Sequence, residues 1–359
     1  RDKYEDLIEE EANRVQAGID IWNGPLVSAC LFKTYDGDHL LIAIHHLVVD
    51  AVSWRIILED LAIAYEQAVK GQEIKLGLKT DSFKNWSEKI SEYSNSKKLL
   101  NEIEFWSRFE NLDDIIPLPK DNHIEERRFK NSNIIRLILD EEETANILKN
   151  VNKAYNTEVN DILIAALGLA VKKWTGINKV AINIEGHGRE EIIEDTNISR
   201  TVGWFTSLYP IVLDLHESDN LSYIIRYVKD TIRKIPNKGI GYGIIKYLTK
   251  EENKAAIKFK LKPEISFNYL GEFSNVLEGR QFEVSHLSVG KTIGGDYNRK
   301  HAIDVNCFIS NGKLFVEFTY NSDEYREETI SNMAEYYKQA ISVIIDHCIK
   351  KEHPEFTPS

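Results

Sequence analysis

Cysteine is scarce in this chain. Its three cysteines, Cys30, Cys307 and Cys348, lie far apart and form no C-x-x-C pair, which argues against a disulfide framework or a zinc site. No apolar run approaches the roughly 18 residues that a membrane-spanning helix needs. We therefore expect a reduced, cytoplasmic protein without a membrane partner.

Positive charge is also in deficit. Lysine and arginine number 45 against 57 aspartates and glutamates, and the net charge of -12 argues against a general affinity for nucleic acid or anionic membrane. The 359 residues, 42% of them hydrophobic, are typical of a globular protein of about two domains. There is no initiator methionine or signal peptide, and the chain opens in mid-pattern with the acidic amphipathic stretch RDKYEDLIEEEANRV. We expect it to be part of something longer.

Strand and helix patterns alternate in the first third of the chain. Two apolar segments, 26–32 and 39–46, predict strands joined by a hairpin turn at Asp36-Gly37. Apolar residues at i, i+3 and i+4 then predict a helix over 53–69, which stops near the next glycine.

A more polar section follows. Residues 80–110 have a helical pattern, with Trp86 and Trp106 as anchors. Prolines and charges over 115–133 are typical of a linker, so we place a domain boundary in that segment.

The second half repeats the alternation of strands and helices. Two α+β halves of similar style predict an α/β fold of two lobes with a cleft between them, an amino-terminal lobe over 1–120 and a carboxy-terminal lobe over 121–359. The expected strands are 133–140, 179–185 (followed by a glycine-flanked turn), 206–215, 264–271, 303–310 and 313–320. The expected helices are 141–156, 159–175, 221–235 and 327–350, and the expected loop is 236–243.

Two adjacent histidines end the second predicted strand, in the stretch HHLVVDAVSW. Strand alternation places His45 and His46 on opposite sides of a strand that is apolar on both. Burial favours the neutral imidazole, which suits either a packed core residue or a general base. The end of a strand, where loops and sites lie, favours a site.

Asp50 follows at the position of a helix N-cap. As a cap, or as a buried ion-pair partner of Arg55 or Arg200, it would fix the loop that carries His46 without touching substrate; direct catalysis is the alternative. Ser53 and Trp54 are interpreted as first-turn and packing residues.

Two other kinds of site are disfavoured. A Ser-His-Asp hydrolase needs a nucleophile elbow, and the chain has no G-x-S-x-G. Two adjacent histidines on opposite faces of a strand do not chelate one metal ion, and no further ligands stand at coordinating spacing.

A second polar group stands in the stretch INIEGHGREE. Glu185 ends a strand on the face opposite Ile182 and Ile184, and the glycines on either side of the next histidine leave the backbone open to close approach by a ligand. The alternative is a solvated carboxylate at a strand end, with Arg189 and Glu190 forming a surface ion pair.

Three further stretches combine glycine with aromatic residues: SRTVGWFTSLYP, PNKGIGYG and FNYLGEF. In the first, Gly203 precedes Trp204 and Phe205, which gives a local hinge beside bulky walls, or simply an aromatic core segment. The G-x-G-x-G spacing that includes Gly241 is not the dinucleotide fingerprint, which needs G-x-G-x-x-G before a helix.

Taken in order, these stretches resemble the motifs of the epimerization domains of nonribosomal peptide synthetases. HHLVVDAVSW is similar to the family's H-H-x-x-x-D-x-x-S-W motif, with Ala51 where the family commonly has glycine. EGHGRE matches the family's signature, and RTVGWFTSLYP, PNKGIGYG and FNYLGEF match three further motifs. The first motif lies in the predicted amino-terminal lobe and the other four in the predicted carboxy-terminal lobe.

The resemblance implies a chloramphenicol acetyltransferase-like fold, a pseudo-dimer of two-layer α+β lobes in a V with the site at their junction. The first lobe would be incomplete, because the family begins with a further amino-terminal portion. The implied substrate is an aminoacyl or peptidyl thioester on the 4'-phosphopantetheine arm of a carrier protein, inverted at Cα from L to D. No cofactor of the domain's own is implied, and the expected partners are an upstream peptidyl carrier protein domain and a downstream condensation domain.

The resemblance also implies roles for individual residues. His46 and Glu185 would transfer protons at the two faces of Cα. His45, Asp50, Arg200, Asn268 and Tyr269 would support them, and Ser53, Trp54, Gly203, Trp204, Phe205 and Gly241 would line the substrate tunnel.

Two alternatives to epimerization remain. A condensation domain shares the histidine motif but forms an amide bond, and it generally lacks EGHGRE and RTVGWFT. A non-catalytic domain that recruits carrier proteins is the other, and the basic pairs Lys172-Lys173 and Arg127-Arg128 are candidate docking patches or solvated faces.

Overall fold

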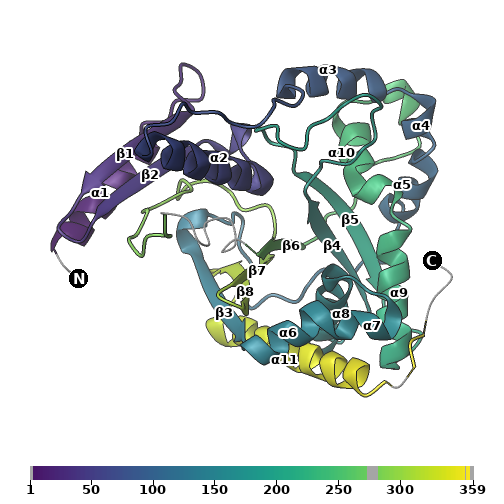
Figure 1. Cartoon of the computed structure of the whole chain (residues 1–359). Helices are drawn as coiled ribbons and strands as arrows, with labels where there is room; N and C mark the ends of the chain where they lie inside the picture. The colour runs from purple at the N-terminus through teal and green to yellow at the C-terminus, as the bar shows by residue number, and fades with distance from the viewer. Residues whose placement is uncertain (1–2, 273–281, 352, 356–359) are drawn as a thin grey trace. The chain divides into compact units, whose positions relative to one another are not determined.

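The chain divides into two compact units. The structure, a computed structural model, describes residues 3–272, 282–351 and 353–355 (Figure 1). The predicted domain boundary, between residues 120 and 121, lies inside the second unit. The helices that follow residue 86 contact elements from the second half of the chain and therefore belong to that unit. The first unit comprises Arg1–Trp86, Asp195–Phe205 and Ser274–Tyr297, and the second comprises Ser87–Glu194, Thr206–Phe273 and Asn298–Ser359.

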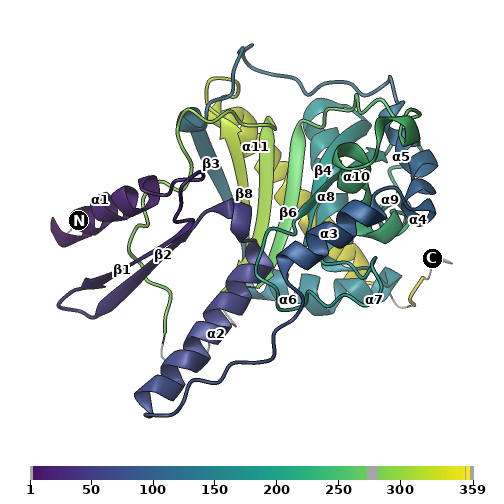
Figure 2. The same cartoon turned by 90° about the horizontal axis from the view of Figure 1, so that it is seen from above.

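The first unit is built on the predicted β-hairpin. Strands β1 and β2 pair antiparallel, and the turn between them passes through Gly37 at a positive φ of 142°. Helix α1 packs against both strands (Figure 2). The elements are α1 (Lys3–Ala17), β1 (Val27–Lys33), β2 (Asp38–Ile44), a 3₁₀ helix (His46–Val48) and α2 (Ala51–Val69).

Three helices form the polar middle section, as the pattern predicts: α3 (Phe83–Tyr93), α4 (Lys97–Leu100) and α5 (Ile103–Glu110). Trp106 is fully buried, and its indole donates a hydrogen bond of 3.0 Å to Glu102 Oε2. The predicted linker has no helix or strand over its described residues 115–127 and leads through a 3₁₀ turn into the first strand of the second unit.

A six-stranded mixed sheet forms the core of the second unit. Its order is β3-β8-β7-β6-β4-β5, in which β4, β6 and β7 are parallel neighbours and the remaining pairs are antiparallel. The strands are β3 (Ser132–Leu139), β4 (Lys179–Gly186), β5 (Ser207–Asp214), β6 (Ile265–Glu272), β7 (Ile303–Ser310) and β8 (Lys313–Asn321).

The two faces of this sheet differ in polarity. Along β7 and β8, buried apolar residues alternate with half-buried residues, many of them polar, so one face is apolar and the other carries the polar groups. Helices α8 and α11 contact strands of the sheet and each other (Figure 1). The helices of this layer are α6 (Glu141–Lys149), α7 (Val151–Tyr155), α8 (Val159–Thr175), α9 (Leu221–Arg233) and α11 (Glu327–Ile349).

One predicted loop is partly helical. The stretch PNKGIGYG forms a short 3₁₀ turn, and helix α10 (Ile240–Tyr247) begins directly after it. Gly239, at a φ of 84°, turns the chain, and Ile240 and Ile244 then fall on one buried helical face. The prediction of a loop over 236–243 is therefore wrong in its second half.

The described residues include no helix long and apolar enough to span a membrane. Within the same ranges there is no cluster of three or more side chains suited to hold a metal ion. All three cysteines are free.

Candidate active site

The two histidines lie beyond the strand that was expected to carry them. Strand β2 ends at Ile44, and His45 turns the chain into the 3₁₀ helix because its Nδ1 accepts a hydrogen bond of 3.1 Å from the Leu47 N–H. His45 is half-buried and His46 is exposed. The expected strand alternation and the expected burial of His46 are therefore wrong: one histidine caps the turn and the other is presented by it.

Asp50 fixes this loop in two directions. It is 2% exposed, and its Oδ1 accepts a hydrogen bond of 2.6 Å from the Ser53 N–H, which makes it the predicted N-cap of α2. Its Oδ2 accepts a second bond, of 3.1 Å, from the Phe205 N–H. Arg200 is not its ion-pair partner, since that guanidinium pairs with Glu59 and Asp60 on α2.

The motif RTVGWF is hydrogen-bonded to the histidine motif through Ser53 and Gly203. The buried Ser53 hydroxyl donates to the Gly203 carbonyl at 2.9 Å and accepts from the Gly203 N–H at 3.0 Å. A Cβ on Gly203 would lie 2.3 Å from Cδ2 of Phe83, so only glycine fits this position. Ser53 and Gly203 therefore hold two segments of the first unit together.

The two aromatic residues of this motif have different environments. Phe205 is 3% exposed and packs on the rings of Phe83 and Trp86. Trp204 is 43% exposed, and its ring lies 5.3 Å from the His46 imidazole, centroid to centroid. Trp204, one of the predicted tunnel residues, thus lies beside His46, while Trp54 is half-buried on α2.

In the second unit, Glu185 lies near the end of β4 and is half-buried. Asn268 on the neighbouring strand β6 donates a hydrogen bond of 2.8 Å to its Oε2. The parallel register that pairs Asn183 with Ser266 puts these two side chains on the same face of the sheet. Tyr269 is paired with the buried Cys307, so its side chain belongs to the opposite face.

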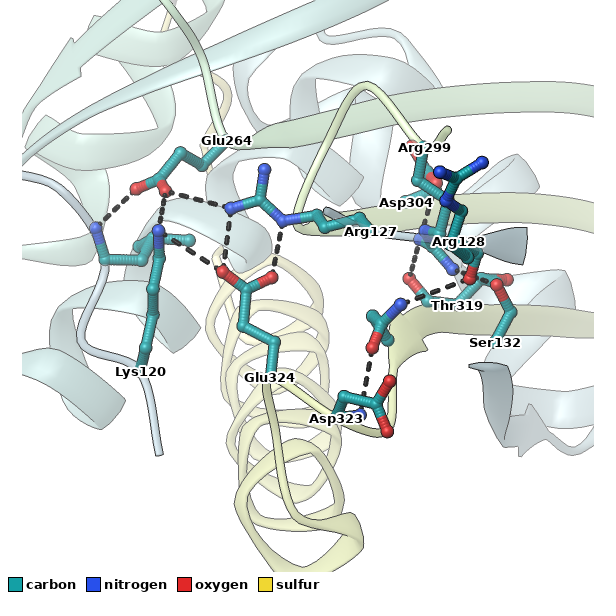
Figure 3. A network of polar contacts seen from close by, with 12 residues as sticks. Lys120, Arg127, Arg128, Ser132, Glu264, Arg299, Asp304, Thr319, Asp323 and Glu324 are labelled. Carbon is teal, nitrogen blue, oxygen red and sulfur yellow. Dashed lines mark hydrogen bonds and ion pairs between the residues drawn. The ribbon is translucent and has the colours of Figure 1, made fainter. Parts of the chain in front are cut away.

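A chain of hydrogen bonds extends along this polar face beside Glu185. Asn183 Nδ2 donates to His301 Nε2 at 2.8 Å, and His301 Nδ1 donates to Asp304 at 3.1 Å. The buried Arg299 donates to Asp304 at 2.7 Å and also to Ser132 at 3.0 Å (Figure 3). Burial alone would raise the pKa of Asp304, but the hydrogen bond from His301 and the charge of Arg299 lower it.

Lys300 lies in the sequence between Arg299 and His301, two members of this series of hydrogen bonds. Burial and the neighbouring charge of Lys246 lower the pKa of Lys300, and the carboxylate of Glu185 acts in the opposite direction. The hydrogen-bond partner that the structure places on Glu185 is the amide of Asn268.

The EGHGRE turn holds itself together through its other polar residues. His187 Nδ1 accepts from the Arg189 N–H at 3.0 Å, and its Nε2 lies 3.1 Å from Glu190. Lys238 completes the group at 3.6 Å from Glu190. Glu190 thus pairs with His187 and Lys238 rather than with Arg189, the pair that the alternative interpretation proposed.

Gly241 lies against a buried carboxylate. A Cβ at this position would be 2.0 Å from Glu102 Oε2. Glu102 accepts hydrogen bonds from Trp106 Nε1 at 3.0 Å and from Asn237 Nδ2 at 2.7 Å. Burial raises the pKa of Glu102, and these two hydrogen bonds oppose that shift.

Three of the four basic residues considered as docking patches form ion pairs within the chain. Arg127 donates to Glu324 at 2.7 Å and also pairs with Glu264, in a network that includes Lys120 (Figure 3). Arg128 pairs with Glu126 and Lys172 with Asp219.

Sequence reasoning missed the polar chain through Asn183, Arg299, His301 and Asp304. A signal was present in the strand IDVNCFIS, where Asp304 and Asn306 share the face opposite the apolar residues. The pairing of that face with Asn183 depends on strand order, which the sequence does not state.

The mixed α/β architecture is the chloramphenicol acetyltransferase-like fold of condensation domains, as the resemblance implied. The chain matches the Condensation domain family over residues 1–359 and belongs to that family.

Relatives of this chain are nonribosomal peptide synthetases. It is 49% identical over 366 residues to gramicidin S synthase 1 of Brevibacillus brevis, covering 100% of this chain and 33% of that protein. It is 47% identical to surfactin synthase subunit 1 of Bacillus subtilis (strain 168), covering 99% of this chain and 10% of that protein. The crystal structure of the epimerization domain from the third module of tyrocidine synthetase B matches with a TM-score of 0.93 and 44% identity, over 98% of this chain and 79% of that one.

Proposed function

We propose that this chain inverts the Cα of an aminoacyl or peptidyl thioester from L to D while the substrate is attached to the phosphopantetheine arm of a carrier protein. The observation that carries the proposal is Glu185, a half-buried carboxylate oriented by Asn268 on the polar face of the sheet. Inversion requires a group that removes or returns the Cα proton. Amide-bond formation leaves that proton in place. The similarity to a solved epimerization domain supports the same assignment.

The reaction exchanges one Cα–H bond for another. A base takes the proton from one face of Cα, the electron pair delocalises into the thioester carbonyl as an enolate, and an acid returns a proton to the other face. The net change is the configuration alone, so no oxidant, reductant or co-substrate is consumed. We propose accordingly that the domain uses no cofactor of its own and acts on the arm of an upstream peptidyl carrier protein domain, for a downstream condensation domain.

Glu185 is proposed as one acid–base group and His46 as the other. His46 is exposed at the end of a loop that Asp50 and His45 hold in place, which suits a group that must meet an incoming substrate. General acid–base catalysis typically contributes about 10² to 10⁴-fold, so stabilisation of the enolate oxygen must supply the rest. Asn268 is the candidate donor on the face of Glu185, whereas Tyr269 belongs to the opposite face.

The test uses the whole chain with a panel of carrier proteins loaded with L-aminoacyl phosphopantetheine, including apolar, polar and charged amino acids. In D2O the wild type should give mixed L and D product with deuterium at Cα. Glu185→Gln keeps the shape and the contact with Asn268 but loses the proton-transfer group, and the rate of inversion should fall by about 10²-fold or more.

The matched control is Glu317→Gln. Glu317 is a carboxylate on β8 that pairs with the exposed Arg136, and its variant should exchange at the wild-type rate. Normal inversion by Glu185→Gln would overturn the role of Glu185. Amide formation without Cα exchange would favour condensation, and carrier binding with neither reaction would favour a recruitment domain.

A further inference from the structure

We propose that Phe308, Phe315 and Ile138, called here the apolar strip, bind apolar side chains of a peptidyl substrate. The first of these side chains belongs to a residue two or three positions before the one that is inverted. We infer this from the position of the strip relative to Glu185, and it therefore rests on the proposed epimerization. Peptidyl thioesters, rather than single aminoacyl thioesters, are then the substrates that use the strip.

The apolar strip crosses three neighbouring strands of the second unit. Phe308 on β7 is the register partner of Phe315 on β8, which in turn is the partner of Ile138 on β3. The two phenyl rings are stacked, with centroids 5.2 Å apart and planes 4° from parallel. Both phenylalanines are half-buried, and Ile138 is 46% exposed. Adjacent apolar side chains that stay accessible in this way are typical of a surface that binds an apolar group.

The strip lies on the face of the sheet that carries Glu185. Phe308 follows Asn306 by two residues on β7, so the two side chains belong to the same face. Asn306 is the register partner of Asn268, whose amide donates a hydrogen bond of 2.8 Å to Glu185. The row of residues that begins at Glu185 is therefore the direct neighbour of the strip.

The far end of that neighbouring row is an ion pair. The row continues from Asn306 to Glu317 on β8 and to Arg136 on β3, and Arg136 donates a hydrogen bond of 2.9 Å to Glu317. These two charges satisfy each other on the sheet. The strip is thus the feature of this part of the face that suits an apolar ligand group.

The distance between the strip and Glu185 determines which substrate residue the strip can contact. Two strand spacings of about 4.8 Å separate β4 from β7, and one row along the strand adds about 6.6 Å, so Phe308 lies about 12 Å from Glu185. Since an extended peptide advances about 3.3 to 3.6 Å per residue, residues two or three positions before the reacting Cα lie about 7 to 11 Å from it. Their side chains reach the strip, whereas a single aminoacyl group stops short of it.

A β-bulge separates the strip from Glu185. The register between β6 and β7 shifts so that Leu270 and Gly271 together oppose Phe308. Gly271 has a φ of 71° and contributes no side chain. Because a bulge interrupts the regular alternation of side chains, the strip ends at β7 instead of continuing over the carboxylate. It therefore contacts a part of the substrate other than the reacting residue.

The stacked rings also have a structural effect, because a cross-strand aromatic pair stabilises the pairing of β7 with β8. A pair with that role alone would change stability and would treat all substrates alike. A subsite instead distinguishes one acyl group from another, so the experiments compare substrates.

The first experiment measures binding and needs no turnover. The full chain is titrated by calorimetry with a carrier protein whose phosphopantetheine arm bears its acyl group through a stable amide. The acyl group is an alanyl group, a tetrapeptide with leucine two and three positions before its last residue, or the same tetrapeptide with serine at both positions. The leucine peptide should bind about tenfold more tightly than the serine peptide, because the strip buries part of a leucine side chain.

Variants on the same face of the sheet locate the effect. Phe308→Ala should remove the preference for the leucine peptide, and Phe308→Leu should keep most of it because the side chain stays apolar. If Phe308→Ala does not fold, Phe308→Thr replaces it, since threonine suits a strand. The matched control is Ile134→Ala: Ile134 is 52% exposed on the same face of β3 as Ile138, but it is paired with Thr319, outside the strip, and its variant should bind like wild type.

The second experiment follows inversion of the corresponding thioesters. Phe308→Ala should raise KM for the leucine peptide about tenfold with kcat unchanged, because the strip binds ground state and transition state alike, and it should leave the alanyl substrate unaffected. Equal binding of the leucine and serine peptides by wild type would overturn the inference. Equal weakening of all three carriers by Phe308→Ala would also overturn it, since the strip would then bind the arm or support the fold alone. Absence of Cα exchange in the wild type, with the leucine preference present, would refute the proposed function and support the peptide subsite.

Discussion

Alanine substitutions at Gly241 and Gly243, both on α10, are predicted to change the free energy of unfolding in opposite directions. A Cβ on Gly241 would lie 2.0 Å from Glu102 Oε2, whereas a Cβ on Gly243 would meet nothing within 4 Å. Glu102 is 5% exposed, so in Gly241→Ala its carboxylate has to turn away from Trp106 and Asn237 without gaining water. Because hydrogen bonds to a charged group contribute about 1.5 to 3 kcal/mol each, we expect a loss of about 3 kcal/mol or more in the free energy of unfolding.

Gly243→Ala should behave in the opposite way. It replaces glycine by the best helix former without a clash, which is expected to stabilise the chain by about 0.5 to 1 kcal/mol. Urea denaturation followed by far-UV circular dichroism gives both values, with the m-value checked for each variant. Equal effects of the two substitutions, or a stable Gly241→Ala, would refute the assignment of Gly241 as a contact to the buried carboxylate.

Two further predictions concern buried carboxylates. Asp50→Ala should cost about 2 to 4 kcal/mol, from a lost cap of about 1 kcal/mol and an unpaired Phe205 N–H of about 1 to 3 kcal/mol, measured by hydrogen exchange at that amide and in α2. Asp140→Ala, which removes the exposed N-cap of α6, should cost only about 1 kcal/mol, and a similar cost for both would show that the Phe205 bond contributes nothing. Because the pKa of Glu102 is higher in the folded chain than in the unfolded chain, the unfolded chain loses the Glu102 proton at a lower pH. The free energy of unfolding therefore decreases as the pH rises above the unfolded-state pKa of this group. Glu102→Gln should therefore gain stability relative to wild type between pH 4 and pH 7, and a difference that is flat with pH would contradict the shift.

Local sequence information was sufficient for most of the secondary structure. The hairpin at Gly37, the cap of α2 by Asp50 and the end of α8 at residue 175 each depend on a few neighbouring residues, and the structure confirms them. Alternation of apolar and polar residues similarly identified the strand that carries Glu185.

The errors arose where one side chain changes the path of the backbone. His45 was assigned to the strand because apolar residues precede it, but its imidazole caps the following turn and ends the strand at Ile44. The glycines of PNKGIGYG suggested a loop, yet Ile240 and Ile244 bury one face of a helix there. In both cases a specific contact outweighed the local preference.

The contacts between distant segments were beyond local patterns. Ser53 and Gly203 bond to each other across 150 positions of the chain, and each motif alone was interpreted as substrate tunnel or core. The same holds for Asn183 and His301, whose pairing follows from the strand order of the sheet. The family motifs named the candidate site residues, but only the fold shows which of them hold one another in place.

The most direct test of the proposed epimerization offers the chain two substrates at once. One carrier protein bears an L-aminoacyl thioester and a second bears another amino acid as the acceptor, in D2O, and mass spectrometry with chiral analysis follows both. We predict deuterium at Cα and the D epimer on the first carrier, with no dipeptide on the second. Dipeptide formation with protium retained at Cα would contradict the proposal.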